Sequence, residues 1–107
     1  MFFQYPGDFT RIDYKPGEKA EYVWGKGILL AKVTVNAETE GSVHDCEQIS
    51  LVLDGEFDLA IGGETKRVKT GDAFHIPAGV RHTVTTVIAK PIVIIDVWPV
   101  GGPKIPD

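Results

Sequence analysis

The sequence predicts an all-β fold, an antiparallel barrel or sandwich, and three observations on its 107 residues support this. Its apolar residues gather in short windows rich in Val, Ile, Thr and aromatic side chains, which favour strands. Turn signals built from glycine, proline and aspartate separate these windows. No window shows a convincing helical repeat with capping residues. Many short strands joined by short turns are typical of barrels and sandwiches.

The expected strands follow one another closely, in the windows 20–24, 28–35, 49–53, 57–61, 73–77, 83–88 and 91–98. Asp54-Gly55 and Gly62-Gly63 lie between alternating runs, so each is expected to form a tight hairpin turn with positive φ. The charged residues that follow are expected on a solvated hairpin edge, where charge discourages aggregation: Glu64, Lys66, Arg67 and Lys69. Residues 99–107 are expected to form an irregular tail.

Length and composition bound the class of protein. Residues 1–107 are expected to form one domain with its core at about 20–98, because 43% hydrophobic residues suffice for an ordinary core. A net charge of −4 argues against nucleic acid and anionic membranes as partners. The single cysteine, Cys46, excludes an internal disulfide framework and fits a reducing compartment. No signal peptide or membrane-spanning run is evident, so the expected location is the cytoplasm.

Strand parity places the first candidate side chains. From Ser42 to Val52 the even positions share one face of an extended chain and the odd positions share the other. His44 and Gln48 are therefore expected on the same side, where an imidazole nitrogen and an amide oxygen reach one point in a barrel mouth. Downstream, Gly71 to His82 combines a turn glycine, an apolar run and a Pro77-Ala-Gly79 corner, which aims His82 into that mouth.

These two segments resemble the two motifs of the cupin family, across about half of the chain. The second motif matches at Gly71 to Pro77 and Gly79 to His82, whereas the first matches at His44 and Gly55. The resemblance implies the double-stranded β-helix, or jelly-roll, barrel of the cupins. Because cupins include enzymes, sugar isomerases, storage proteins and ligand sensors, the fold alone does not give the function.

The resemblance also implies a metal site. Transferred by position, the ligand places of a typical cupin, three histidines and a glutamate, are Ser42, His44, Gln48 and His82. Serine replaces one histidine and an amide replaces the carboxylate. His44, Gln48 and His82 therefore form the expected ligand set for a divalent transition metal (zinc, iron, nickel or manganese), held more weakly than by the complete set.

Structural roles stay open beside these assignments. Cys46 shares the parity of His44 and offers a replacement ligand, although a free cysteine is more often a small buried hydrophobe. His75 is a second spare ligand, more often a barrel-wall residue. The alternative for His44 and His82 is that they are hydrogen-bonded structural residues, and the alternative for Gln48 is that it bonds only to neighbouring side chains.

A narrower resemblance is to the small cupins of pectin and alginate breakdown that linearise unsaturated uronates, in which glutamine also replaces the usual glutamate. Their last strand ends in an Asp-x-aromatic step, matched here by Asp96-Val-Trp98. The resemblance implies that Asp96 transfers protons and that Trp98 forms a wall against the sugar ring; the alternative for Asp96 is a solvent-facing strand end. The basic residue expected after this step is absent, so Arg11 or Arg81 would have to hold the substrate carboxylate.

Three classes of function follow from these features. The first is a metal-dependent enzyme with isomerase- or lyase-like proton transfer on a small polar substrate such as a sugar acid. The second is a metal-free or weakly metallated module that binds or senses a small molecule, supported by the neutral pair Ser42 and Gln48. The third is an accessory protein that acts through a protein partner. The resemblance also implies a homodimer.

Overall fold

A computed structural model of the chain describes residues 1–15 and 17–100, and these residues form strands and no helix. The expected all-β fold is confirmed. The seven strands are β1 (Thr10–Lys15), β2 (Glu18–Trp24), β3 (Leu29–Val35), β4 (Gln48–Ile61), β5 (Glu64–Lys69), β6 (Ala73–Ile76) and β7 (His82–Trp98). No helix among the described residues has the length and hydropathy needed to cross a bilayer.

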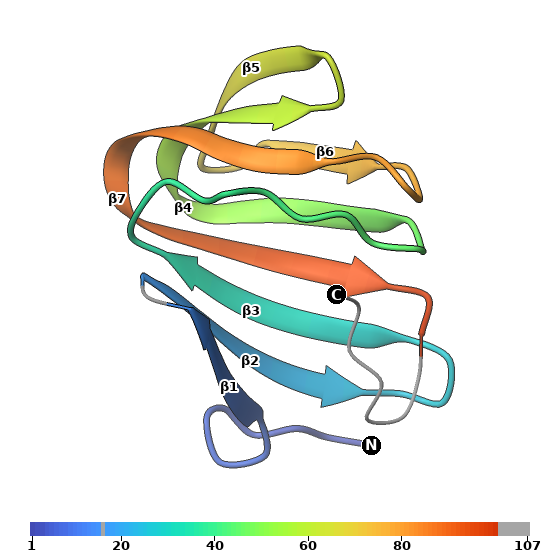
Figure 1. Cartoon of the computed structure of the whole chain (residues 1–107). Helices are drawn as coiled ribbons and strands as arrows, with labels where there is room; N and C mark the ends of the chain where they lie inside the picture. Colours follow the sequence, from blue (N-terminus) through green and yellow to red (C-terminus); the bar gives the residue numbers. More distant parts are fainter. Residues whose placement is uncertain (16, 101–107) are drawn as a thin grey trace.

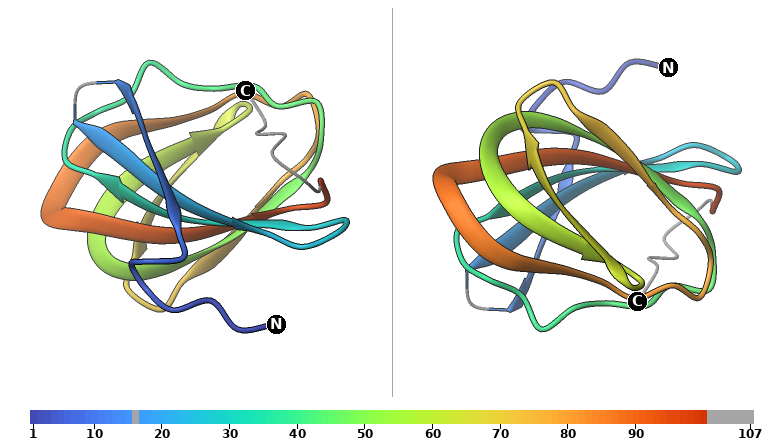
Figure 2. Two further views of the ribbon diagram at one scale, coloured as in Figure 1. Left: turned by 90° about the horizontal axis from the view of Figure 1, so that it is seen from below. Right: turned by 90° about the horizontal axis from the view of Figure 1, so that it is seen from above.

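All strand pairs are antiparallel, in the order β1-β2-β3-β7-β4-β5, and β6 also pairs with β4 (Figure 1). The two longest strands, β4 and β7, run beside each other from the pair Ile49 and Val97 to the pair Ile61 and His82. Both strands bend, so that β3 and β6 flank one end of this pair and β5 flanks the other. End-on views show the sheet rolled around a common interior (Figure 2).

The bends correct two expectations about the strands. Windows 49–53 and 57–61 are one strand, β4, and windows 83–88 and 91–98 are one strand, β7. Asp54-Gly55 is therefore not a hairpin turn. Gly55 lies inside β4 with φ 104°, and a side chain there would meet the Pro91 carbonyl oxygen at 2.7 Å. Glycine lets β4 bend closely over β7, a use of positive φ that the local sequence does not distinguish from a turn.

Two other expectations were closer to the structure. Gly62-Gly63 does form a two-residue hairpin, because Ile61 pairs with Glu64 across it. The charged strand beyond it, β5, is an exposed edge strand. β1 precedes the expected core at 20–98 and adds an edge strand on the other side. Of the expected tail, residues 101–107 lie outside the described part of the chain.

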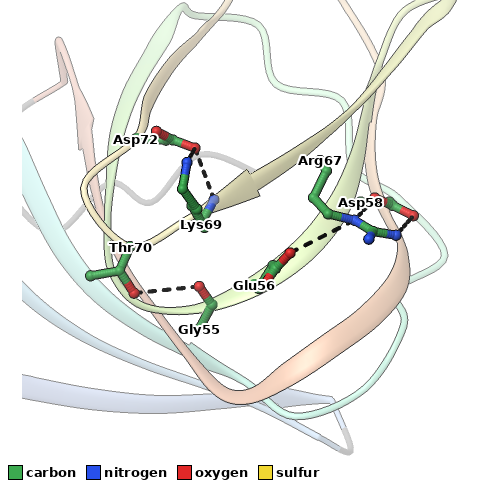
Figure 3. Close-up of polar contacts among 7 residues, drawn as sticks. All are labelled: Gly55, Glu56, Asp58, Arg67, Lys69, Thr70 and Asp72. Atoms are coloured by element: carbon green, nitrogen blue, oxygen red, sulfur yellow. Dashed lines mark hydrogen bonds and ion pairs between the residues drawn. The ribbon is translucent and has the colours of Figure 1, made fainter.

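Ion pairs follow the β4–β5 hairpin (Figure 3). The Arg67 guanidinium donates to both carboxylate oxygens of Asp58, at 3.0 and 3.3 Å, and its Nε lies 4.0 Å from Glu56. Lys69 lies 3.8 Å from Asp72 in the turn that follows. Such exposed pairs contribute about 0–1 kcal/mol each. Their main effect here is to give the free edge of the sheet a charged, hydrated surface.

The core lies inside the roll, and β3 and the second half of β7 contribute to it by strict alternation. In β3 the odd residues from Leu29 to Val35 are buried, and in β7 the even residues from Ile92 to Trp98 are buried. Further core side chains include Tyr22, Val52, Phe57, Leu59 and Val84. The same inward rows contain polar residues at one end of the barrel, Gln48 and Ser50 on β4 and Asp96 on β7. This end contains the candidate site.

Candidate functional site

The two histidines that the motifs pair are neighbours in the structure. The imidazole rings of His44 and His82 lie 4.9 Å apart, centre to centre. Two backbone hydrogen bonds between Ser42 and His82, at 2.9 and 3.0 Å, hold the two segments together. The Gly79 amide donates to the His44 carbonyl at 2.8 Å, which ties the proline–glycine corner to the same segment. The expected approach of His44 to His82 is confirmed.

The route by which His44 reaches this position differs from the expectation. β4 begins at Gln48, and residues 43–47 form no strand, although Ser42 makes a single bridge with His82. Exposure nevertheless alternates, because Val43, Asp45 and Glu47 are exposed while the even positions between them are half-buried. Parity therefore predicted correctly that His44 and Gln48 lie on the less exposed side of this segment, although the segment is not a regular strand.

A chain of hydrogen bonds joins four buried side chains from β4 and β7. The Trp98 indole donates from Nε1 to Gln48 Oε1 at 3.0 Å. The Gln48 amide donates from Nε2 to Ser50 Oγ at 2.9 Å, and Ser50 Oγ donates to Asp96 Oδ1 at 2.6 Å. The last contact follows from the strand register, since Ser50 and Asp96 are directly opposite each other.

Asp96 is 8% exposed, so the alternative of a solvent-facing strand end is wrong. Burial raises the pKa of this carboxyl to about 7. The hydrogen bond from Ser50 and the nearby Gln48 amide both lower the pKa, and the negative charge of Glu18 adds to the rise. A carboxyl with this pKa exchanges protons near neutral pH, which suits acid–base chemistry.

Trp98 is buried at the end of β7, next to the histidines. Its ring lies 5.9 Å from that of His44 in an edge-on arrangement and 6.5 Å from that of Tyr22. It does not line the cavity described below. The structure therefore gives Trp98 contacts within the protein, and its role as a wall against a sugar ring stays a prediction.

A cavity of about 70 Å³ lies beside Asp96 inside the barrel. Its polar lining comes from β2, β4, β7 and the loop between β3 and β4, and its apolar lining comes from β3, β4, β6 and β7. The lining residues are Glu18, Thr39, Ser42, Gln48, His82, Asp96, Val33, Val35, Leu59, Phe74, Val84 and Ile94. Sequence reasoning missed Glu18, because no local pattern connects β2 to this cavity. It also missed Ser50, although Ser50 shares the inward parity of Gln48.

The donor set for a metal is incomplete in the described part of the chain. No group of three or more His, Cys, Asp and Glu side chains there is arranged to hold a metal ion. Catalytic metal sites usually have three protein ligands, and here two imidazoles are adjacent while the Gln48 amide is held by Trp98 and Ser50. These residues do not fit a tightly held metal.

The two spare ligands do not complete the set. His75 is exposed, and its Nε2 lies 2.8 Å from Glu47 on the surface. Cys46 is half-buried and packs against the apolar core. Neither of the two arginines considered for a substrate carboxylate, Arg11 and Arg81, lines the cavity. Arg81 donates instead to the Glu40 carbonyl at 2.9 Å.

A family model described as "Cupin domain" matches residues 29–98, which is more than half of the chain. The chain belongs to the cupin family. The match covers β3 to β7 and therefore includes both histidines, the hydrogen-bonded chain and Asp96. No curated protein matches this cupin.

Solved structures agree with the family. An RmlC-like cupin from Shewanella frigidimarina is 22% identical, with a TM-score of 0.80 over 97% of this chain and 94% of that one. KdgF from Halomonas sp. is 23% identical, with a TM-score of 0.77 over 92% and 94%. A mutant oxalate decarboxylase from Bacillus subtilis is 15% identical, with a TM-score of 0.78. The match covers 94% of this chain and 30% of that one. At these identities the likeness shows the fold.

Proposed function

We propose that this cupin is an enzyme that binds a small polar molecule, such as a sugar acid, in the barrel and moves a proton through Asp96. The chemistry is of the isomerase or lyase type. The observation that supports it best is the buried Asp96 carboxyl in the cavity wall, with its pKa raised to about 7. Both protonation states are then populated near neutral pH, so one carboxyl can serve as acid or base.

The cavity limits which part of a substrate lies beside Asp96. Ligand pockets usually measure about 300–1,000 Å³, whereas this cavity of about 70 Å³ has room for one end of a sugar acid. Two carboxyl groups, Glu18 and Asp96, and no Lys or Arg line it in the described residues. A substrate carboxylate beside them would be repelled. The hydroxyl or carbonyl end of the substrate therefore enters, and its carboxylate stays outside.

Metal dependence has weaker support than proton transfer. A divalent ion here would be held by His44 and His82, where it would polarise a substrate oxygen. Two imidazoles alone hold a metal weakly, and no third His, Cys, Asp or Glu side chain joins them among the described residues. We therefore expect less than one metal ion per chain in untagged protein. His82→Ala is expected to remove what is bound. Elemental analysis measures both, and full occupancy would contradict the incomplete donor set.

Turnover tests the proposed role of Asp96. Unsaturated galacturonate is the first substrate to try, because the motifs resemble those of cupins that linearise unsaturated uronates. Asp96→Asn keeps the size of the side chain but cannot exchange a proton at neutral pH. We expect its turnover number to fall roughly 10²–10⁴-fold with little change in substrate affinity. Asp54→Asn, at an exposed position of β4, is the matched control and should retain full turnover. Wild-type turnover by Asp96→Asn would overturn the proposal.

A binding or sensor role without catalysis is the second candidate. It is favoured by the neutral groups at two of the usual ligand places, Ser42 and Gln48, both of which line the cavity. This candidate predicts that a ligand raises the melting temperature equally with and without a strong chelator, while wild-type protein leaves the ligand unchanged. Turnover of the same ligand by the wild type, lost in Asp96→Asn, would exclude it.

A further inference from the structure

The hydrogen bonds that join Trp98 to Asp96 have a fixed direction. An indole N–H can only donate, so Gln48 must present its amide oxygen to Trp98. The Gln48 NH₂ group then faces Ser50, and because it too can only donate, Ser50 Oγ must accept. The single hydroxyl hydrogen of Ser50 is left for the acceptor 2.6 Å away, Asp96 Oδ1.

Burial makes this direction hard to reverse. Gln48, Ser50, Asp96 and Trp98 are between 3% and 8% exposed, so bulk water does not compete for their hydrogen bonds. A reversed chain would require the Gln48 amide to turn over, which would set two donors, its NH₂ and the indole N–H, against each other. A buried donor without an acceptor is unfavourable, because it loses its hydrogen bonds to water and gains none within the protein.

We propose that Gln48 and Ser50 are positioning residues for Asp96. Anchored by the Trp98 indole, they keep the Ser50 hydroxyl hydrogen on Oδ1 and leave Oδ2 as the oxygen that gives or takes the proton. This inference rests on the proposed role of Asp96 as the group that transfers the proton. The proton moves between Oδ2 and a substrate atom, while Oδ1 accepts from Ser50 in both protonation states.

The inference also explains why position 48 has an amide side chain and not a carboxylate. A carboxylate there would still accept from Trp98, but it has no N–H to offer Ser50. The Ser50 hydroxyl could then donate to position 48 instead of Asp96, and the direction of the chain would be lost. Trp98 acquires the role of an anchor, which agrees with its burial and with the fact that it does not itself line the cavity.

Infrared spectroscopy of the substrate-free protein tests this arrangement. We expect Asp96 to be protonated at pH 5, because burial raises its pKa to about 7. Its carbonyl stretch is then identified as the band that Asp96→Asn lacks. In the wild type, Oδ1 is the carbonyl oxygen and accepts from Ser50, which lowers its stretching frequency. We expect Ser50→Ala to shift the band to higher wavenumber. Trp98→Phe, which removes the anchoring N–H and keeps a ring, should shift it in the same direction by a smaller amount.

Trp24→Phe is the matched control. The Trp24 indole N–H is also buried, but it has no hydrogen-bond partner among the described residues, so its loss should leave the Asp96 band unmoved. The inference is overturned if Ser50→Ala leaves the band in place, or if Trp98→Phe behaves like Trp24→Phe. If Ser50→Ala fails to fold, the two tryptophan variants decide the question alone. Because no substrate is used, this result is independent of the turnover test.

Discussion

Asp96 combines burial with a hydrogen-bonded oxygen, and the two have opposite effects on its charge. Burial disfavours the carboxylate and raises the pKa, whereas donation from Ser50 favours the carboxylate. Burial has the larger effect, so the pKa lies at about 7. The residue is therefore neutral in mildly acidic solution and acquires its charge close to physiological pH.

This shift predicts how stability depends on pH. An unfolded chain binds the Asp96 proton with a pKa of about 3.9, and the folded chain binds it with a pKa of about 7. Between these values the folded state holds the extra proton, so raising the pH destabilises it, by at most about 1.4 kcal/mol per pH unit. The stability that the folded state gains by binding this proton more tightly than the unfolded chain is fully present below pH 4 and is lost above pH 7.

Urea unfolding at pH 5 and pH 8 checks this expectation. Asp96→Asn cannot ionise, so its free energy of unfolding, relative to the wild type, should rise as the pH increases from 5 to 8. Asp54→Asn, at its exposed position, should follow the wild type at both values. An unchanged difference between wild type and Asp96→Asn across this range would show that Asp96 is already ionised in the folded protein at pH 5, which would contradict the raised pKa.

Individual site residues were predictable where a motif or parity applied. His44 and His82 were placed together by the two motifs, and Gln48 was placed inward by its spacing from His44. The contact between Ser50 and Asp96 was not predictable. The two residues are 46 positions apart in the sequence, and they meet only through the register of two bent strands. Glu18 reaches the cavity from β2 by the same kind of long-range placement.

At the scale of elements, the bend of β4 depends on Gly55. A Cβ atom at this position would lie 2.7 Å from the Pro91 carbonyl oxygen and 2.9 Å from the Ile92 Cα atom. These are backbone atoms of β7, which cannot move aside without shifting the strand that ends in Asp96 and Trp98. The position of Asp96 and Trp98 therefore depends on the close packing of β4 against β7 at Gly55, in the middle of the barrel.

Gly55→Ala is expected to destabilise the fold by roughly 2–4 kcal/mol, as the sum of backbone strain and steric overlap. Gly71→Ala is the matched control, because Gly71 has a similar φ of 93° with no atom within 4 Å of an added Cβ. It should show the backbone strain alone, about 1–2 kcal/mol. Chemical denaturation compares the two variants, and equal losses would mean that the close approach to β7 contributes nothing.

Five of the seven strands lie in the expected apolar windows and β5 was expected from its charge, whereas β1 and the continuity of β4 and β7 were not predicted. Residues 49–61 were divided because Asp54-Gly55 has the composition of a turn, yet the chain continues as one strand through it. Residues 83–98 were also divided, at Ala89-Lys90, and there too the chain continues as one strand. A bend within a strand and a turn between strands use the same residue types, so local sequence does not separate them.

At the scale of the whole molecule, β4 and β7 contribute most of the candidate site. Their pairing places polar residues at the same end of the inward rows, next to the two histidines. The outward side of β4 exposes Ile49, Leu51 and Leu53. The homodimer implied by the family resemblance stays a prediction, and this apolar row is where a second copy would be expected to pack.

Nuclear magnetic resonance of the Asp96 side-chain carboxyl carbon, followed from pH 4 to pH 9 in substrate-free protein, tests the central claim most directly. The claim is that this cupin keeps one buried carboxyl ready to exchange a proton near neutral pH. We expect the Asp96 signal, assigned by its absence in Asp96→Asn, to titrate with a midpoint of about 7. A midpoint near 4, as for an ordinary aspartate, would contradict the account.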